Sequence, residues 1–394
     1  MSPSVRPRLL FVSACVGILV FGIVLAILGT VFGLPAMHER MQVSLAQQGT
    51  LILFLYLGIF VSSVVVGPLI DHLGNKVNLL ASALIVALAM VFFAEARSFA
   101  SASIAAVLLG LGGGGLNTCN NVLVSDLYAS QRGAMLNLLG MVFGVGALSV
   151  PLLAASVAGR FTIPELFLFC AVLSIISALC YAAISFPPAK TTQAFSWSEL
   201  SEVAKYHGVL LLAFILFCES GNEACIAGWT STYLGITGYT PRIATLVLAT
   251  YWAALMVSRM LAAKILQGIP KLRLIIGAGL VALAGAIVLL SARSLILFFV
   301  GTTLIGLSYG PIFPTTLAIA GDRHSNRAGT VFGLLFSIAL IGGMLFPWIV
   351  GQVSQAVSVR SGMIVPGVGA IGIVALSIAV ALGERKSKAM SSVR

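Results

Sequence analysis

The central stretch of the sequence, residues 208–235, reads GVLLLAFILFCESGNEACIAGWTSTYLG. It is long and apolar enough to cross a bilayer as a helix, because about 20 such residues span the hydrocarbon core. It nevertheless carries two glutamates, Glu219 and Glu223, near its middle. A carboxylate at that depth costs about 3 kcal/mol or more and marks a functional site by default. The stretch therefore predicts a membrane protein that handles a polar solute, or its coupling ion, inside the bilayer.

The rest of the chain has the same apolar character. Of its 394 residues, 59% are hydrophobic and 8% are charged, whereas a soluble domain carries roughly 25% charged residues. Polar residues divide the chain into apolar segments of membrane-spanning length. The expected spans are residues 9–36, 47–70, 77–96, 102–127, 133–158, 164–186, 208–235, 242–266, 272–292, 295–320, 328–353 and 361–383. The sequence thus predicts an all-α membrane protein with twelve transmembrane helices, and no separate soluble domain.

A polar connection and an internal repeat divide the chain into two halves. Residues 187–207 separate the sixth and seventh spans and predict a cytoplasmic linker with a short amphipathic helix around 196–199. A shift of 196 residues pairs glycines, prolines and acids of the two halves: Gly110 with Gly306, Asp126 with Asp322, Gly146 with Gly342 and Pro151 with Pro347. We therefore expect an N-terminal six-helix bundle over 1–186 and a C-terminal six-helix bundle over 208–394, related by pseudo-symmetry.

The net charge of +11 follows from an uneven distribution of Lys and Arg among the loops. Most of them fall in alternate connections, and the remaining connections hold only single arginines: Arg40, Arg97, Arg160, Arg242, Arg293 and Arg360. Cytoplasmic loops carry the excess of positive charge. We therefore expect both termini in the cytoplasm and a multi-pass protein of a plasma membrane, here a bacterial inner membrane. The charge indicates a lipid bilayer around the protein and no nucleic-acid partner.

The loop after the second span reads GPLIDHLGNK, from Gly67 to Lys76, and predicts a tight turn at Gly74. Its pattern resembles the Gly-x-x-x-Asp-x-x-Gly-x-Lys/Arg motif of the major facilitator superfamily. The resemblance implies two pseudo-symmetric six-helix bundles and alternating access. It also implies a gating role for Gly67, Asp71, Gly74 and Lys76, with Asp71 pairing near the start of the eleventh span in one state.

Two further charge pairs are candidates for gating. Asp126 with Arg132, and Asp322 with Arg327, bracket the cytoplasmic ends of the fourth and tenth spans. Such clusters would break and re-form as the carrier changes state. The alternative is that they are solvated helix ends, whose ion pairs contribute about 1 kcal/mol or less.

The fourth span places three asparagines at bilayer depth. Asn117 and Asn121 share a helix face because they are four residues apart, and Asn120 lies beside them. Uncharged amides there can hydrogen-bond the hydroxyls of a substrate. The alternative is that they join helices to one another, a frequent use of asparagine in membranes.

The seventh span carries a stripe of polar and aromatic residues that suits a sugar. Glu219, Asn222, Glu223 and Trp229 recur at helical spacing, which puts most of the stripe on one face. Carboxylates and amides accept or donate directional hydrogen bonds, and an indole covers the C–H face of a sugar ring. Residues from other spans that could complete the surface are Asn137, Tyr251, Trp252, Tyr309 and Trp348. For each aromatic, the alternative is packing or lipid contact.

Three short segments resemble the fucose and glucose–galactose proton symporter branch of the superfamily: residues 115–121, 218–223 and 306–314. The resemblance implies uptake of a hexose-like monosaccharide. The sequence departs from that branch because the first span has no acidic residue and Asn117 stands where the branch has a glutamate. Either Glu219 and Glu223 have taken over proton coupling, sharing one proton as a unit, or the carrier is sodium-coupled or uncoupled.

The sequence favours a carrier over other classes of protein. It has no phosphate-binding loop, no catalytic set and no metal-ligand set at membrane depth, so we expect no enzyme activity, no cofactor and no metal. The predicted function is secondary active transport of a monosaccharide by a monomer. The alternatives are a drug or lipid exporter of the same fold, against which the asparagine-rich midplane argues, and a non-transporting nutrient receptor.

Overall fold

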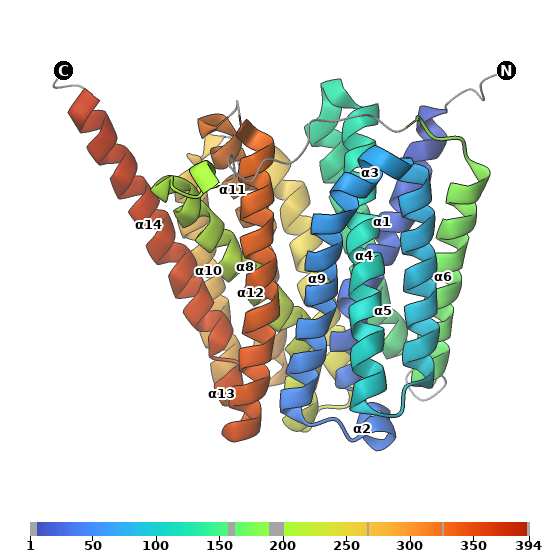
Figure 1. Cartoon of the computed structure of the whole chain (residues 1–394). Coiled ribbons are helices and arrows are strands. Elements are labelled where there is room, and N and C mark those ends of the chain that lie inside the picture. The colour runs from blue at the N-terminus through green and yellow to red at the C-terminus, as the bar shows by residue number, and fades with distance from the viewer. Residues whose placement is uncertain (1–5, 157–161, 189–200, 266–267, 325–326, 392–394) are drawn as a thin grey trace. The chain divides into compact units, whose positions relative to one another are not determined.

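The computed structural model describes residues 6–156, 162–188, 201–265, 268–324 and 327–391, whose regular structure is helical (Figure 1). The helices are α1 Pro7–Phe32, α2 Pro35–Met41, α3 Leu45–Glu95, α4 Phe99–Leu127, η1 Ala129–Gln131, α5 Arg132–Ser156, α6 Ile163–Ala183, α8 His207–Ile236, α9 Pro241–Ile265, α10 Lys271–Ser291, α11 Leu295–Arg323, α12 Ala328–Ala356, α13 Val359–Gly362 and α14 Val365–Ser391. The amphipathic helix predicted around 196–199 lies outside the described residues.

Eleven of the described helices are long and apolar enough to cross a membrane. One of them, α3, has 51 residues and would measure about 76 Å if straight, close to twice the thickness of a bilayer. It breaks at Gly74, whose backbone is non-helical at φ 78° and ψ 166°, a conformation that glycine adopts without steric penalty. Because α3 supplies two spans, the prediction of twelve transmembrane helices in an all-α fold is confirmed.

The connection inside α3 is shorter than the gap of residues 71–76 between the second and third predicted spans, and it turns at Gly74, as predicted. The helix continues through most of residues 67–76, and Gly74 is its non-helical residue. The Asn78 amide nitrogen donates to the carbonyl oxygens of Leu69 at 3.1 Å and Gly74 at 2.8 Å. These bonds stabilise carbonyls that the break would otherwise leave unsatisfied.

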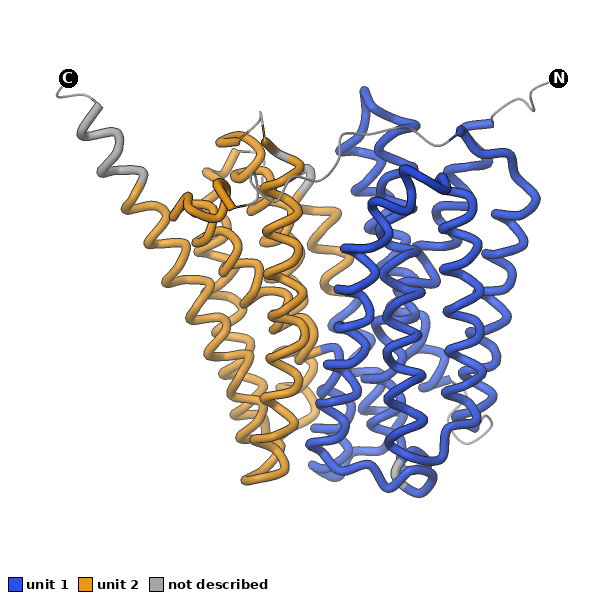
Figure 2. Tube along the Cα trace, in the orientation of Figure 1, with its two compact units in different colours: residues 1–194, 227–252 blue, residues 195–226, 253–394 orange. Residues whose placement is uncertain are grey.

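Two compact units make up the chain (Figure 2). Unit 1 combines residues 1–194 with 227–252, and unit 2 combines 195–226 with 253–394. This division differs from the predicted bundles, 1–186 and 208–394, because the end of α8 and the start of α9 pack within unit 1. The predicted bundle boundaries stay a prediction about the folding domains.

Glycines in and directly after α1 explain why residues 227–252 belong to unit 1. A Cβ atom added to Gly29 would lie 1.9 Å from the Ala227 carbonyl oxygen, and one added to Gly33 would lie 2.5 Å from the Ser231 Cβ atom. Backbones approach this closely only where a side chain is missing. On α3, the Gln48 side chain also reaches Thr232, with 3.5 Å between Oε1 and Oγ1.

Helix ends in the two units follow the predicted shift of 196 residues. The residue before α4, Ser98, has φ −139° and ψ 157°, and its counterpart before α11, Ser294, has φ −134° and ψ 155°. At the other end, Tyr128 has φ −125° and ψ 49°, and His324 has φ −132° and ψ 45°. The repeat is therefore kept in the conformations of the caps as well as in the sequence.

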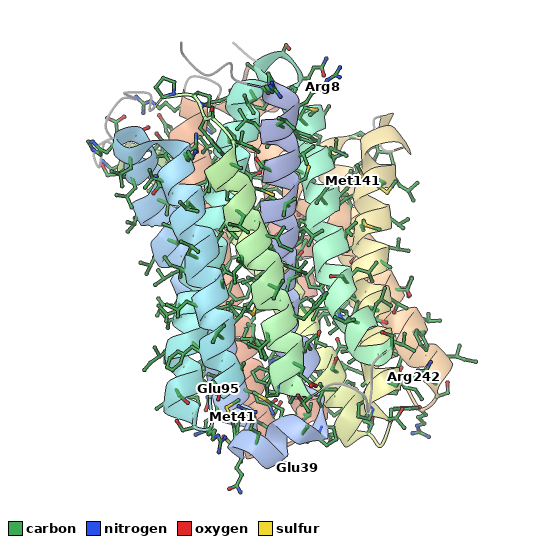
Figure 3. All side chains as sticks on the ribbon, turned by 90° about the vertical axis from the view of Figure 1, so that its right-hand side faces the viewer. Arg8, Glu39, Met41, Glu95, Met141 and Arg242 are labelled. Atoms are coloured by element: carbon green, nitrogen blue, oxygen red, sulfur yellow. The ribbon has the colours of Figure 1, made fainter. Side chains whose placement is uncertain are left out.

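An arginine covers the carbonyl end of a long helix in each unit. In unit 1, Arg40 on α2 donates to the carbonyl oxygens of Ala94 and, at 3.0 Å, Ala96 at the end of α3. In unit 2, Arg360 on α13 donates to the Leu290 carbonyl oxygen at the end of α10, at 3.1 Å. A cation at a helix C-terminus satisfies free carbonyls and complements the helix dipole. Figure 3 shows that Glu39, Met41 and Glu95 lie at the end of unit 1 opposite Arg8.

Candidate functional site

The acidic pair of the seventh span lies in unit 2, on α8. Glu219 is 1% exposed and Asn222 is completely buried, and Glu223 lies one helical turn further along. They share a face of the helix because their spacings are three and four residues. Between these residues, Gly221 has no side chain, and Phe346 of α12 occupies the space beside it. A Cβ atom on Gly221 would lie 2.5 Å from Phe346. The small residue thus lets α12 press against the polar turn of α8.

A cation from a neighbouring helix faces this pair. The Arg259 guanidinium of α9 lies 3.7 Å from the Glu223 carboxylate, and the two side chains are 20% and 15% exposed. Both residues belong to unit 2. The sequence predicted a membrane span over residues 242–266, which includes Arg259, but it did not identify a partner for this arginine. The signal was available, because Arg259 falls inside the predicted span 242–266 and an ionisable residue there marks a functional site.

Close packing of α9 and α11 sets the position of Arg259. Ser258 donates a hydrogen bond from its Oγ to the Leu307 carbonyl oxygen on α11. A Cβ atom on Gly310 would lie 2.6 Å from the Ser258 Oγ and 3.0 Å from the Arg259 backbone nitrogen. Gly310 therefore permits the approach of the two helices, and the hydrogen bond keeps Ser258 in register. This contact is a structural reason for Gly310 in the segment 306–314.

The same cluster contains buried polar atoms without hydrogen bonds. No hydrogen bond of ordinary length and angle joins either polar atom of the Asn222 amide, or Oε1 of Glu219, to a described residue. Tyr309 of α11 is 1% exposed and lies beside Asn222 and both carboxyls. On the other side, a Cβ atom on Gly369 of α14 would lie 2.2 Å from the Asn222 Oδ1. Leaving such a group unsatisfied costs about 1–3 kcal/mol, so the cluster is suited to receive a proton, a water molecule or a polar ligand.

The asparagines of α4 lie in unit 1 and fall into two groups. Asn117 and Asn121 are half-buried, and the Asn121 amide nitrogen donates to the Asn117 Oδ1 at 2.9 Å and to its carbonyl oxygen at 2.8 Å. Asn120 is completely buried. Its amide donates to the Leu116 carbonyl oxygen at 2.8 Å and accepts from the Tyr181 hydroxyl at 3.2 Å. These bonds favour the helix-joining alternative for Asn120, whereas Asn117 and Asn121 remain accessible.

Aromatic side chains gather in unit 1 around Trp252 of α9. Its indole ring is 1% exposed and meets Phe143 of α5 edge-on, with ring centroids 6.0 Å apart. Tyr251 lies 5.2 Å away on the same helix, and Phe143 also contacts Phe21 of α1 at 5.5 Å. The Trp252 indole N–H has no hydrogen-bond partner among the described residues. It is therefore a buried donor available to a polar ligand.

The other predicted substrate residues are distributed over both units. Trp229 on α8 is completely buried within unit 1, and Asn137 on α5 of the same unit is half-buried. Trp348 on α12 is exposed at 36% on the surface of unit 2. The structure therefore groups Glu219, Asn222, Glu223 and Tyr309, together with Arg259, in unit 2. In unit 1 it groups Tyr251 with Trp252, and Asn117 with Asn121.

The loop motif at 67–76 has a structural role within unit 1. The Lys76 ammonium donates to the carbonyl oxygens of Ala182 at 2.8 Å and Ile184 at 2.9 Å, at the end of α6. Gly74 makes the break in α3, and a Cβ atom on Gly67 would meet nothing within 4 Å. Asp71 forms no ion pair with a described residue of unit 1. The gating role of these residues stays a prediction.

The second pair of gating candidates has partners that the sequence did not identify. Asp322 forms an ion pair with Lys271 at the start of α10. Arg327 forms one with Glu202, at 2.6 Å between its Nη1 and the carboxylate. Asp322 and Arg327 thus each form an ion pair with another residue of unit 2, and their gating role stays a prediction. In unit 1, Asp126 and Arg132 are exposed on either side of η1.

Comparison with known proteins connects this architecture to one family. The family model described as Major Facilitator Superfamily matches residues 14–347. The chain belongs to the Major Facilitator Superfamily. This match runs from α1 to α12 and so includes both the α3 loop motif and the acidic cluster of α8. The superfamily resemblance that the loop motif indicated is confirmed.

Relatives with curated descriptions are distant but cover most of the chain. The glucose/mannose transporter GlcP of Bacillus subtilis (strain 168) is 26% identical over 339 residues, which are 80% of this chain and 81% of the relative. An uncharacterised transporter of the superfamily from the same organism, YfkL, is 23% identical over 305 residues, 74% of this chain and 75% of the relative. Together with the family match, they identify a superfamily transporter and not an enzyme.

Solved structures of superfamily members share the fold. The nucleoside transporter NupG superposes with a TM-score of 0.77 at 12% identity and covers 95% of this chain and 99% of its own. A D-xylose–proton symporter superposes with a TM-score of 0.75 at 11% identity and covers 95% and 97%. A bacterial homologue of the lysosomal transporter Spinster reaches 0.76 at 16% identity and covers 96% and 98%. Because these identities are low, the likeness shows the fold alone, and this superfamily member is a multi-pass membrane protein.

Proposed function

We propose that this transporter carries a monosaccharide across the membrane by alternating access, coupled to a proton. The observation that carries the proposal is the buried cluster of unit 2, in which Glu219, Asn222, Glu223, Arg259 and Tyr309 surround polar atoms without hydrogen bonds. Similarity to a glucose/mannose transporter and to a D-xylose–proton symporter supports a sugar as the substrate.

Charge neutrality supports a proton as the coupling ion. Two ionised carboxylates and one guanidinium give the cluster a net charge of −1, and protonation of one carboxyl makes it neutral. A buried net charge is unfavourable in an apolar surrounding. The conformational change between transport states therefore costs the least free energy when the cluster is neutral. This links proton binding at Glu219 or Glu223 to the conformational change. Because Arg259 already balances one carboxylate, the cluster needs one proton to become neutral.

Sugar contacts are assigned to residues of each unit separately. In unit 1, Asn117 and Asn121 present an accessible amide pair, Trp252 a free indole N–H, and Asn137, Trp229 and Tyr251 complete the set of candidates. In unit 2, Asn222, Glu223, Tyr309 and Trp348 are the candidates. Amides and carboxylates recognise hydroxyls directionally, and aromatic rings stack on the apolar face of a sugar.

The orientation follows from the charge of the loops. We propose that both termini are cytoplasmic and that the protein works as a monomer in a bacterial inner membrane. The single arginines Arg40, Arg97, Arg242, Arg293 and Arg360 would then face the outside. Cysteine introduced at Arg97 should react with an impermeant maleimide in intact cells, and cysteine introduced at Arg8 should not.

Transport by the purified protein tests the proposal. Proteoliposomes would be given radiolabelled glucose, mannose or xylose under an imposed pH gradient, a sodium gradient or no gradient. We expect at least one sugar to accumulate above equilibrium with the pH gradient, and only to equilibrate in the other two conditions. Accumulation driven by the sodium gradient would show that sodium, and not the proton, is the coupling ion. Equilibration under all conditions would identify a uniporter. Uptake of nucleosides with none of the sugars would refute the monosaccharide.

A matched pair of glutamate variants checks the site. Glu223→Gln should abolish accumulation driven by the pH gradient, because the cluster is then neutral without a proton. Glu95→Gln, at the exposed end of α3, should accumulate sugar like the unmodified protein. Equal behaviour of the two variants would remove Glu223 from the coupling site.

A further inference from the structure

A groove on unit 1 shares no lining residue with the acidic cluster of unit 2. Its volume is about 760 Å³, and its walls come from α1, α5, α6 and the first turns of α9. Leu19, Leu153, Phe169 and Leu173 are among its apolar lining residues. The polar residues at its walls include Ser149 and Ser156, whose hydroxyls donate to backbone carbonyls of their own helix. The hydroxyls are therefore already occupied, and the interior of the groove is apolar.

The charged residue among those lining the groove is an arginine at its end. Arg242 is the second residue of α9, and no acidic residue accompanies it in the lining. Its guanidinium is exposed and forms no ion pair with a described residue. In Figure 3, Arg242 lies at the end of unit 1 where Glu95 lies, opposite Arg8. The cation thus lies at one end of unit 1 and lines the apolar groove.

The depth of the groove matches one leaflet of a bilayer. Along α5 it extends from Ser156, at the end of the helix, to Ser149, about 10 Å further in. Along α6 it reaches Leu173, about 15 Å from the helix start at Ile163. Half of the hydrocarbon core is about 15 Å thick. The groove is therefore long enough to hold one acyl chain whose headgroup lies at Arg242.

Tight packing behind the groove keeps this space from extending inward. A Cβ atom on Gly146 of α5 would lie 2.1 Å from the Leu19 carbonyl oxygen of α1. The two helices therefore touch at Leu19, which also lines the groove. Two other lining residues, Leu152 and Phe169, are 42% and 47% exposed, so the groove opens at the surface of the unit, as an acyl chain lying between the helices requires.

We propose that this groove binds an anionic glycerophospholipid, with one acyl chain between α1, α5 and α6 and the phosphate on the Arg242 guanidinium. The guanidinium has a planar set of donors that matches two phosphate oxygens. This site is independent of the proposed transport function, because it shares no residue with the cluster of unit 2 or with the sugar candidates of unit 1.

Native mass spectrometry of the purified full chain tests the site. The detergent-solubilised protein would be given phosphatidylglycerol or phosphatidylcholine with identical acyl chains, and the bound lipid counted. We expect one retained phosphatidylglycerol, preferred about fivefold over phosphatidylcholine, as is typical of one arginine next to an anionic lipid. Arg242→Gln should reduce the preference to about onefold. The matched control is Arg97→Gln, at an exposed arginine that does not line the groove, and it should keep the fivefold preference.

A second variant tests the apolar part of the groove separately. Leu153→Trp fills the space between α5 and α6 and should lower the retention of both lipids severalfold. Equal preference in the unmodified protein and in Arg242→Gln would overturn the assignment of the headgroup. Unchanged retention in Leu153→Trp would overturn the assignment of the acyl chain. The headgroup is tested with Arg242→Gln and the acyl chain with Leu153→Trp. A folding defect in one variant therefore leaves the test with the other variant valid.

Discussion

Arg259 changes how the acidic pair of α8 is understood. With Glu219 and Glu223 alone, two like charges would face each other one helical turn apart. With the guanidinium 3.7 Å from Glu223, one carboxylate is paired and Glu219, which is 1% exposed, is the group left for a proton. The close contact of α9 and α11 at Gly310 holds the Arg259 backbone in place for this pairing.

Neutralising Arg259 should destabilise the protein, and removing its partner as well should restore it. Arg259→Gln leaves Glu223 buried without a counter-charge, and breaking a buried pair in this way costs about 3 kcal/mol. We expect a clear fall in the midpoint of thermal unfolding for Arg259→Gln and recovery of most of it in the double variant Glu223→Gln, Arg259→Gln. Additive losses in a double-mutant cycle would show that the two side chains do not interact.

A second residue-level prediction concerns the free donor in unit 1. Replacing Trp252 with Phe keeps a ring against Phe143 and removes the indole N–H. If the N–H binds a sugar hydroxyl, the KM for uptake should rise about tenfold while the thermal midpoint changes little. Tyr239→Phe is a suitable control at a tyrosine outside the candidate set. An unchanged KM in Trp252→Phe would assign this residue to packing.

Glycines at equivalent places allow the helices of each unit to touch. On α5, a Cβ atom at Gly146 would lie 2.1 Å from the Leu19 carbonyl oxygen, and on α12, one at Gly342 would lie 2.0 Å from the Phe217 carbonyl oxygen. The two positions are 196 residues apart, so the repeat has kept the contact as well as the residue. In both units, the missing side chain lets backbone approach backbone between helices that are distant in the sequence.

Gly146→Ala and Gly342→Ala should therefore each destabilise the protein by about 1–3 kcal/mol, the usual range for an overpacked core. The same helices provide controls, because a Cβ atom at Gly140 of α5 or Gly333 of α12 would meet nothing within 4 Å. Gly140→Ala and Gly333→Ala should leave the thermal midpoint unchanged or raise it, since alanine favours a helix over glycine. Four similar midpoints would contradict the contact.

Variants of Arg40 and Arg360 measure how much the arginines at the ends of α3 and α10 stabilise the protein. Arg40→Gln and Arg360→Gln remove charged donors from the terminal carbonyls and should each lower stability by about 1–2 kcal/mol. Arg97 and Arg293 follow the same two helices, are exposed and are equivalent in the repeat. Their glutamine variants should have little effect, and a loss equal to that of Arg40→Gln would point to general surface charge.

Across the whole molecule, the chain is divided by contacts and not by sequence position. Residues 227–252 follow the linker, yet they pack within unit 1 through Gly29 and Gly33. Helices α8 and α9 therefore contribute one part to each unit. The linker separates the two halves of the sequence repeat, whereas the two compact units are defined by which parts of the backbone are in contact.

Proton coupling is a property of the complete transport cycle and can be separated from sugar binding. Glu219→Gln removes the proton site without adding charge. We expect it to retain exchange of labelled for unlabelled sugar at equilibrium, because a neutral cluster still permits the change of state, and to lose accumulation driven by a pH gradient. A variant that accumulates sugar as before would transfer coupling to another residue, and one that loses exchange as well would make Glu219 part of sugar binding.

The sequence alone determined the number and placement of the membrane spans. The predicted span 208–235 became α8, His207–Ile236, and the predicted span 272–292 became α10, Lys271–Ser291. Length and apolar composition act locally, and a bilayer demands that each segment satisfy its own backbone as a helix. The same local chemistry revealed the two glutamates, the glycine turn of α3 and the repeat.

The partners of these residues were decided by the tertiary structure. Nothing near Glu223 in the sequence indicates Arg259, and the same is true of Asn120 with Tyr181 and of Lys76 with the end of α6. The reason is physical. In a soluble helix, an apolar stripe identifies the face that packs inward. A membrane helix is apolar on the lipid side as well, so its sequence does not show which face points inward. The packing of the helices against one another therefore sets which side chains meet.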